Sequence, residues 1–508
     1  MLRRLAIVVA IAAVTAYVVV VAEILRPPHE FTTDPEIIAD VTQLNPIRVD
    51  KVIRPTTTDE IVSAVRNHEG AISIGGARHS MGGQIASEHS LHIDMRRFEG
   101  VLAFRPNEKQ ITVQAGARWR SLQERIDPAN LSIQIMQSYS NFTVGGSLSV
   151  NAHGRYVGHG PIIESVKSIR IVLADGSVVN ADREHNSEIF YGAIGGYGGL
   201  GVITEATLDL ADNVKLKRRA DTIAVSHYKE YFFSNIRESA DALFHNADIY
   251  PPKYETAHLV TFFKTDEPVT VPDHLISTYK SYRQERFGYW LVSRWRWGAW
   301  LRQYILDPMH YRDEPVVWRN YEASYDAAEL EPAARAVSTY ALQEYFVPVD
   351  HFDDFVNRMR NVFRQYKPSI VNVSVRHANK DPGSLLAWAR TEVFAFVIYY
   401  SQGTSADAQA RVGEWTRDLI DAASSLGGSY YLPYQLHATD EQFLKAYPDA
   451  LKFFELKRRL DPTNKFRNEL WNKYYHPHVG ARASEDFHLA FPNGNRHAAM
   501  SVARVITA

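Results

Sequence analysis

Glycine residues gather at four places within the first 201 residues of this 508-residue chain. The clusters occupy residues 75–83, 145–146, 154–160 and 195–201, and short runs that predict strands separate them. Glycine lets a backbone amide approach a ligand closely and supplies positive φ angles, so a strand that ends in such a turn can form a nest of amides around a phosphate. One cluster alone is more often an ordinary turn, but four in one region favour a domain built around a phosphate-bearing ligand.

The glycine clusters do not match the best-known nucleotide-binding motifs. The sequence has no Gly-x-Gly-x-x-Gly segment that opens a helix, and it has no P-loop. The surrounding pattern instead predicts an α+β domain that ends near Asp212, with strands at residues 71–74, 91–94 and 111–114. The Asp175–Gly176 turn between two β-branched runs predicts a hairpin.

A second region begins near Lys215, where basic residues cluster. Its pattern predicts a helix over residues 352–366, with apolar residues at helical spacing, and a strand over residues 391–400. A chain of 508 residues also exceeds what one hydrophobic core usually organises, so we expect two domains. Periodicity ends beyond His476, and we interpret the remainder as a peripheral tail.

Composition excludes several classes of function. The 56 basic and 58 acidic side chains nearly cancel, which gives no reason to expect a nucleic-acid partner. The chain has no cysteine, so disulfides, thiolate catalysis, iron–sulfur clusters and cysteine-ligated zinc are excluded, and we predict no metal site.

Residues 5–22 form an uncharged, mostly apolar run that follows two arginines. As a helix this run would be about 27 Å long, close to the hydrocarbon thickness of a bilayer, so residues 1–28 predict a single-pass signal anchor. The positive charges before the run predict a cytoplasmic N-terminus and a catalytic body on the outer or periplasmic side of the membrane. A cleaved signal peptide is the alternative, because residues 13–16 could be read as a cleavage site, and either interpretation exports the body.

Three glycine-bearing segments together resemble the vanillyl-alcohol-oxidase, or PCMH-type, FAD flavoproteins. Residues 74–84, IGGARHSMGGQ, resemble the pyrophosphate loop, and the closest likeness is to alditol and aldonolactone oxidases. Residues 138–154 resemble the second FAD segment, and residues 195–204 resemble the third, which wraps the adenosine half. Four later segments look like the decaprenylphosphoryl-ribose oxidase branch: residues 342–348, 430–434, 443–448 and 457–462.

This resemblance implies a fold and an activity. The fold would be a PCMH-type, two-subdomain FAD-binding domain over residues 45–213 and an α+β cap, or substrate, domain over residues 214–440. Residues 441–476 would return to the FAD domain, and residues 477–508 would form the tail. The activity would be that of an FAD-linked oxidase or dehydrogenase that oxidises a CH–OH group of a sugar, alditol, lactone or lipid-linked alcohol by hydride transfer to flavin. Oxygen or a quinone would accept the electrons.

The resemblance also implies which residues hold FAD. They lie on the three glycine-bearing segments and are Gly75, Gly76, Ala77, Arg78, His79, Ser80, Met81, Ser138, Thr143, Gly146, Ser147, Val150, Asn151, Ala152, His153, Gly201 and Val202. His79 is the candidate for a covalent bond to the flavin, because some family members bind it through a histidine of this loop. The ribose-oxidase branch lacks that histidine and holds FAD without a bond.

Four residues are predicted to act beside the flavin ring, namely His153, Arg155, Arg376 and Tyr434. His153 would stabilise the reduced, anionic flavin, and Arg155 matches a lysine that points to the substrate in the ribose-oxidase branch. Alternation along residues 373–377 places Ser374 and Arg376 on one face of a strand, where sugar-alcohol and aldonolactone oxidases carry Glu-x-Arg.

Ser374 stands where those oxidases carry an acid, and a hydroxyl is too weak a base near neutral pH. A base could come from His377, Tyr434 or Glu392, and the sequence does not choose among them. The missing acid also agrees with a flavin-dependent reductase of a lipid C=C bond. A third hypothesis, from another class, is a membrane-tethered, non-catalytic protein that kept the flavin fold.

Residues 286–306 contain four tryptophans and four arginines but no acid. This composition suits a helix that lies at a lipid interface, and such a helix could admit an amphiphilic substrate. The alternative is a tryptophan-rich cap helix that packs against the domain.

Overall fold

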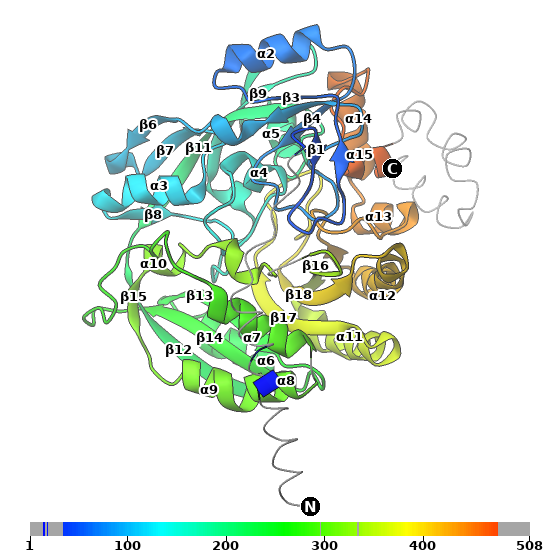
Figure 1. Cartoon of the computed structure of the whole chain (residues 1–508). Coiled ribbons are helices and arrows are strands. Elements are labelled where there is room, and N and C mark those ends of the chain that lie inside the picture. The colour runs from blue at the N-terminus through cyan, green and yellow to red at the C-terminus, as the bar shows by residue number, and fades with distance from the viewer. Residues whose placement is uncertain (1–13, 16–17, 19–33, 295, 333–334, 476–508) are drawn as a thin grey trace, which may run out of the picture.

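The computed structural model describes residues 14–15, 18, 34–294, 296–332 and 335–475, which form a mixed fold of helices and sheets (Figure 1). The predicted membrane helix lies outside the described residues apart from Val14, Thr15 and Val18, and so does the predicted tail from residue 477. Among the helices within the described ranges, none is long and apolar enough to cross a membrane.

A small parallel sheet delivers the first glycine cluster. Its strands lie in the order β3 (Lys51–Ile53), β5 (Leu91–Asp94) and β4 (Ile72–Gly75). Helix α2 (Thr58–Asn67) precedes β4, and a capping box between Thr57 and Glu60 fixes its first turn. The chain then leaves the carboxyl end of β4 directly through Gly76. A two-stranded sheet of β1 (Ile37–Ile38) and β2 (Ile47–Arg48) lies before this unit.

An antiparallel sheet positions the second cluster. Its strands lie in the order β10 (Val178–Asp182), β9 (Val166–Val172), β11 (Val202–Asp212), β7 (Gln110–Gln114) and β6 (Val101–Arg105), with β8 (Leu131–Ile133) also paired to β11. The predicted hairpin is confirmed as β9–β10, and its turn holds Gly176 at φ 79°. Helix α4 (Val144–Ser149) carries the second cluster, and a Cβ on Gly145 would lie 2.8 Å from that of Ala115. Helices α3 (Trp119–Ile126) and α5 (Ser187–Ala193) accompany this sheet.

An eight-stranded sheet follows, and it occupies the lower half of Figure 1. Its antiparallel strands lie in the order β15 (Val316–Trp318), β12 (Lys215–Ala224), β14 (Thr256–Lys264), β13 (Ala242–Ile249), β17 (Ser369–Ala378), β18 (Val393–Gly403), β16 (Ser338–Pro348) and β19 (Ser429–Tyr430). The chain enters it between Asp212 and Lys215. The domain boundaries expected from the sequence, at residues 45–213, 214–440 and 441–476, stay predictions.

The two faces of the eight-stranded sheet have different neighbours. Helix α11 (Phe352–Tyr366), which has the predicted bounds, packs on one face, where the rings of Phe355 and Phe396 lie 4.7 Å apart. Helix α12 (Ala406–Ser425) packs beside it and α6 (Tyr228–Phe232) covers the same face, with Tyr228 5.5 Å from Phe394. The opposite face, called the inner face below, turns toward the small parallel sheet and the sheet that contains β11 (Figure 1).

Several short elements border that opposite face. They are α7 (Arg283–Arg294), α8 (Arg296–Leu301), the π-helical turn η7 (Arg302–Leu306), α9 (Asp307–His310), α10 (Arg319–Glu322) and the 3-10 turn η8 (Ala327–Leu330). They include the tryptophan-rich segment singled out in the sequence.

The C-terminal helices return to the first two sheets and bracket the third glycine cluster. These helices are α13 (Asp440–Ala446), α14 (Ala450–Leu460) and α15 (Glu469–Tyr474). The buried ammonium of Lys457 donates to the carbonyl of Gly199 at 2.8 Å, to that of Phe466 at 2.9 Å and to Asp461 at 2.8 Å. The indole of Trp471 donates to the carbonyl of Gly196 at 3.2 Å.

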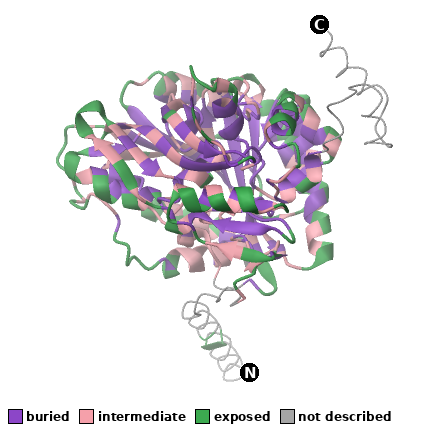
Figure 2. Ribbon diagram, turned by 90° about the horizontal axis from the view of Figure 1, so that it is seen from above, coloured by how far each residue is buried: buried purple, intermediate pink, exposed green. Residues whose placement is uncertain are grey.

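One hydrophobic cluster runs through the sheets and the returning helices. It includes Ile72 of β4, Ile171 of β9, Val375 of β17 and Phe453 of α14. Figure 2 shows this buried interior in purple, with the exposed faces of the outer helices in green. The three larger sheets therefore share one core, whereas Ile38 and Ile47 of the two-stranded sheet belong to a separate small cluster.

We predict that Lys457→Met lowers the free energy of unfolding by about 3–5 kcal/mol, because it leaves the Asp461 carboxylate buried without its partner cation. Chemical denaturation followed by circular dichroism measures the change. Lys452→Met on the same helix is the matched control. Its side chain is 72% exposed in an ion pair with Asp449, so its loss should cost no more than about 1 kcal/mol. Equal losses in the two variants would contradict the role given to Lys457.

Candidate active site

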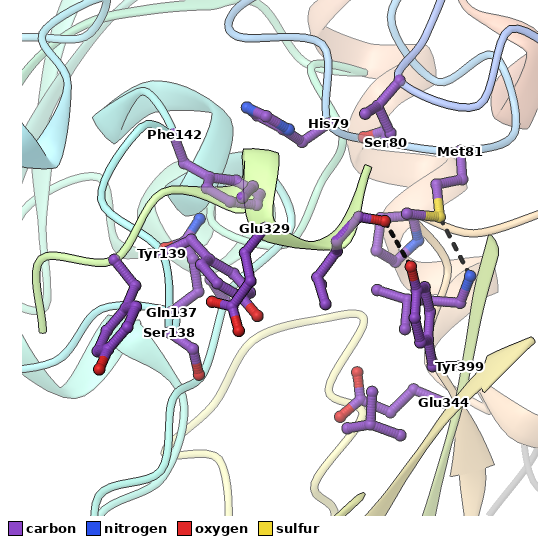
Figure 3. A pocket seen from close by; sticks show the side chains of 18 of the residues that line it. His79, Ser80, Met81, Gln137, Ser138, Tyr139, Phe142, Glu329, Glu344 and Tyr399 are labelled. Atoms are coloured by element: carbon purple, nitrogen blue, oxygen red, sulfur yellow. Dashed lines mark hydrogen bonds between the residues drawn. The ribbon is translucent and has the colours of Figure 1, made fainter. Parts of the chain in front are cut away.

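The three glycine-bearing segments converge on one cavity of about 650 Å³. It lies between the small parallel sheet and the sheet that contains β11 on one side, and the inner face of the eight-stranded sheet on the other. The first segment supplies residues 76–81, the second supplies residues between 137 and 153, and the third supplies Tyr197, Gly198 and Gly201. Figure 3 shows His79 and Phe142 on one wall of this cavity and Glu344 on another. Segments far apart in the sequence therefore form a single elongated site.

Most of the predicted cofactor residues line this cavity. They are Gly76, Ala77, Arg78, His79, Ser80, Met81, Ser138, Thr143, Gly146, Val150, Ala152, His153 and Gly201. The other four lie behind its wall. Gly75 packs against the His92 ring, and Val202 is a buried first residue of β11.

The side chains of Ser147 and Asn151 hold the wall together from behind. The Ser147 hydroxyl donates to the carbonyl of Thr143 at 2.9 Å and accepts from the indole of Trp119 at 2.9 Å. The amide of Asn151 donates to Asp381 at 2.7 Å, which joins the second glycine segment to the loop after β17. Both residues therefore support the loop that lines the cavity.

The inner face of the eight-stranded sheet forms the floor of the cavity. Across β16, β18, β17 and β13, the register pairs Glu344 with Val397, Val397 with Ser374, and Ser374 with Asp248. Residues directly opposite one another share a face, and all four line the cavity. Arg376 lines it as well, so Ser374 and Arg376 lie on one face of β17, as their alternation predicted.

Glu344 is a central carboxylate of the site, and the sequence reasoning did not single it out. Its side chain is buried, and its Oε1 lies 2.7 Å from Nε2 of His153. Nδ1 of the same imidazole lies 3.2 Å from the carbonyl of Gly154. Both ring nitrogens therefore lie within hydrogen-bond distance of an acceptor, and the contact between His153 and Glu344 fixes the imidazole and the carboxylate relative to each other. Glu344 is the one acid in a strand, β16, that is mostly buried, and this was the signal that could have found it.

Tyr434 completes this network. Its hydroxyl donates to Oε2 of Glu344 at 3.3 Å. Burial and the nearby Glu344 raise the pKa of Tyr434 well above its usual range. The phenol therefore stays protonated near neutral pH and acts as a donor to Glu344 rather than as a base.

The other two proposed bases, His377 and Glu392, do not line the cavity. They pair with each other at 2.7 Å, and the His377 ring packs 5.0 Å from that of Phe232 on the helix-covered face of the sheet. Burial lowers the pKa of His377 to about 4. Alternation explains the placement, because residue 377 has the opposite orientation to residues 374 and 376.

The two predicted cavity arginines differ in their partners. Arg155 donates to Glu322 Oε1 at 2.7 Å and lies over the ring of Phe244 at 5.5 Å. Arg376 has no hydrogen bond or ion pair with any protein group in the described part of the chain, and its buried Nε lacks an acceptor. Arg376 is therefore the cation available to a ligand, whereas Arg155 already has a carboxylate.

Comparison with known proteins agrees with this geometry. Residues 49–182 match the sequence model of the FAD binding domain, and residues 207–474, more than half of the chain, match that of D-arabinono-1,4-lactone oxidase. The chain belongs to the D-arabinono-1,4-lactone oxidase family. The resemblance seen in the glycine-bearing segments is thereby confirmed, and the protein is an FAD-dependent oxidoreductase.

Relatives cover most of the chain at low identity. The mouse L-gulonolactone oxidase is 23% identical over 82% of this chain and 92% of its own length. The bovine L-gulonolactone oxidase is 21% identical over 83% of this chain and 94% of its own length. Cytokinin dehydrogenase 5 of Arabidopsis thaliana is 28% identical but covers only 35% of this chain and 36% of its own length. Similarity to the lactone oxidases therefore extends through both halves of the chain.

The cavity fits the FAD of this family. The hydroxyls of Ser138 and Thr143 are buried at its wall and have no hydrogen-bond partner among the described residues. Buried polar groups are nearly always paired, so these hydroxyls are suited to a bound polar group such as a pyrophosphate. A Cβ on Gly76 would lie 2.2 Å from Oγ1 of Thr143, which shows how closely the first two segments approach.

Two further side chains in the cavity have shifted pKa values. The ring of His79 stacks on that of Phe142 at 4.1 Å, and burial together with Arg118 lowers the pKa of His79 to about 4. Its imidazole is therefore neutral near pH 7. Glu329 of η8 also faces the cavity (Figure 3), and burial raises the pKa of its carboxyl to about 7. The sequence reasoning did not single out Glu329, since a 3-10 turn carries no periodic signal.

We predict that Gly76→Ala weakens FAD binding. Overpacking against Thr143 should cost about 1–3 kcal/mol, which is roughly 5- to 150-fold in affinity. The flavin-to-protein absorbance ratio of the purified protein after dialysis measures the loss. Gly70→Ala is the matched control, because Gly70 is exposed, does not line the cavity, and a Cβ there meets only the side chain of His68, at 3.0 Å. Equal flavin retention in both variants would show that the first glycine segment does not hold the cofactor.

Proposed function

We propose that this protein oxidises a CH–OH group of a sugar lactone, with Glu344 as the base. The observation that supports the base is the register of the sheet. Ser374 lacks the acid of the Glu-x-Arg pattern, and Glu344 restores a carboxylate to the same cavity face two strands away. The substrate class follows the relatives, whose names are L-gulonolactone oxidase and D-arabinono-1,4-lactone oxidase.

FAD, when bound, supplies the hydride acceptor for this oxidation. Glu344 takes the hydroxyl proton while the C–H bond gives up its hydride and the C=O bond forms, so two electrons and one proton leave the carbon and another proton leaves the oxygen. Arg376 stabilises the negative charge that develops on that oxygen, because its guanidinium has no carboxylate partner in the described structure.

His153 and Tyr434 act on Glu344 rather than on the substrate. The imidazole at 2.7 Å and the phenol at 3.3 Å each hold one carboxylate oxygen, which fixes the orientation of the base. The missing acid at position 374 agreed with a reductase of lipid C=C bonds. Glu344 supplies a carboxylate to the same cavity, so the site does have an acid. Oxidation is therefore the direction that these residues support.

Oxygen as the electron acceptor and an exported, membrane-anchored location complete the proposal. The word oxidase in the names of the relatives supports oxygen. The apolar run at residues 5–22, which follows two arginines, supports a single-pass anchor with a cytoplasmic N-terminus and an external body.

We predict that L-gulonolactone or D-arabinono-1,4-lactone bleaches the flavin absorbance of the protein under anaerobic conditions. Glu344→Gln should keep its flavin but lower the rate of bleaching by about 10²- to 10⁴-fold, because general-base catalysis is worth that factor. Stopped-flow absorbance measures both rates. Glu392→Gln, on the opposite face of the sheet, should bleach at the rate of the unmodified protein. Failure of a panel of sugar lactones to bleach the unmodified protein would refute the proposed substrate class.

We also propose that His79 binds FAD covalently. A neutral imidazole has the lone pair that a bond to the flavin methyl carbon needs, and the low pKa of His79 keeps the ring neutral. The new C–N bond would replace one methyl C–H bond and the imidazole N–H bond. The two protons and two electrons released would reduce the flavin, which oxygen, the proposed acceptor, would then reoxidise. We predict that flavin fluorescence stays with the denatured protein band on a gel and is absent from the band of His79→Ala. Flavin that leaves both proteins on denaturation would end the covalent proposal and leave the FAD site itself intact.

A further inference from the structure

A compact group of exposed apolar side chains lies on the segment from α8 to α9. Six of the thirteen exposed large hydrophobic residues in the described structure fall there: Trp297, Trp300, Tyr304, Ile305, Leu306 and Met309. Trp297, Trp300 and Tyr304 follow one another at spacings of three and four, which brings them to one side of a helix. Large exposed apolar patches are uncommon on soluble proteins, and they mark sites that contact another protein or a membrane.

The opposite side of the same segment is fixed to the sheet. Arg302 donates to Asp248 of β13 at 2.8 Å and to Asn372 of β17 at 3.1 Å. A Cβ on Gly298 would lie 2.4 Å from the carbonyl of Leu291, so α8 crosses α7 in close contact. The aromatic side chains are therefore held outward by a well-anchored segment.

The segment presents no acidic group beside these aromatic residues. Residues 286–306 contain no Asp or Glu. The first acid that follows, Asp307, accepts from Arg302 at 3.1 Å and from the hydroxyl of Tyr250 at 2.7 Å, so its charge is engaged on the inner side. Tryptophan and tyrosine without nearby acids are the side chains that favour the headgroup region of a bilayer.

This aromatic face adjoins the mouth of the flavin cavity. Leu306, His310 and Tyr311 line the cavity, and Leu306 is also 39% exposed as a member of the apolar group. In Figure 1, α8 and α9 lie at the lower end of the molecule, and α2 lies at the opposite end. The exposed apolar group is therefore continuous with the lining of the cavity at Leu306.

The N-terminal sequence favours a bilayer over another protein as this partner. Residues 5–22 could span a membrane, and eleven residues, 23–33, separate this run from the described fold. A fully extended linker of that length reaches about 40 Å at most, which would keep the folded body close to the lipid surface.

We propose that the α8–η7–α9 face docks on a phospholipid bilayer and holds the cavity mouth at the headgroups. The proposal that this face docks on a bilayer does not depend on which reaction the protein catalyses. Its consequence for the substrate, that a carbinol on an amphiphilic molecule could enter from the lipid side, rests on the proposed function.

The absence of cysteine allows a direct test on the full-length holoenzyme. Trp300→Cys and Tyr304→Cys, each labelled with the fluorophore NBD, are reconstituted into vesicles of phosphatidylcholine and phosphatidylglycerol. Leu102→Cys is the matched control, because Leu102 is an exposed apolar residue of β6, which belongs to a different sheet and lies in the upper half of Figure 1. Spin-labelled phosphatidylcholine should quench the labels at 300 and 304 several-fold more strongly than the label at 102, with a blue shift of their emission.

Two results would overturn the docking surface. One is equal quenching at all three positions. The other is a blue shift at 300 and 304 that needs no vesicles and grows with protein concentration, which would assign the face to a second copy of the chain. Bleaching of each labelled protein by a soluble sugar lactone is measured in parallel. Its failure together with strong quenching at 300 and 304 would count against the proposed function and leave the docking surface standing.

Discussion

The hydrogen-bond register of four antiparallel strands decides which chemical groups meet in the cavity. Glu344, Val397, Ser374 and Asp248 form one row because residues opposite each other in a sheet share a face. The glycine segments close over that row from the other side. The reactive groups therefore come together through strand pairing, and a shift of one residue in β16 would turn the Glu344 carboxylate to the face covered by α11.

Local patterns predicted the parts of the fold that depend on neighbours in sequence. The β9–β10 hairpin, helix α11 and the common face of Ser374 and Arg376 all follow from turn residues or periodicity. Glu344 was missed because β16 pairs with β18, and β18 with β17, so its place beside Ser374 depends on a strand order that alternation cannot reveal.

Charge pairing separates residues that look equivalent in sequence. Arg155 and Arg376 were both predicted to act on the substrate, yet only Arg155 has a carboxylate partner, Glu322, which lies far from it in the chain. Tyr434 was predicted as a possible base, but burial and the carboxylate beside it raise the pKa of the phenol, which stays protonated. Such differences depend on the tertiary neighbours of each group, and a single sequence does not specify those neighbours.

The ammonium of Lys457 is bonded to the carbonyl of Gly199, which lies 258 residues earlier in the chain. During synthesis, the third glycine segment leaves the ribosome long before this partner does. A nascent chain that ends before α15 has no Trp471 to donate a hydrogen bond to the carbonyl of Gly196. The cavity wall formed by the third glycine segment is therefore complete only after nearly the whole described fold has been translated.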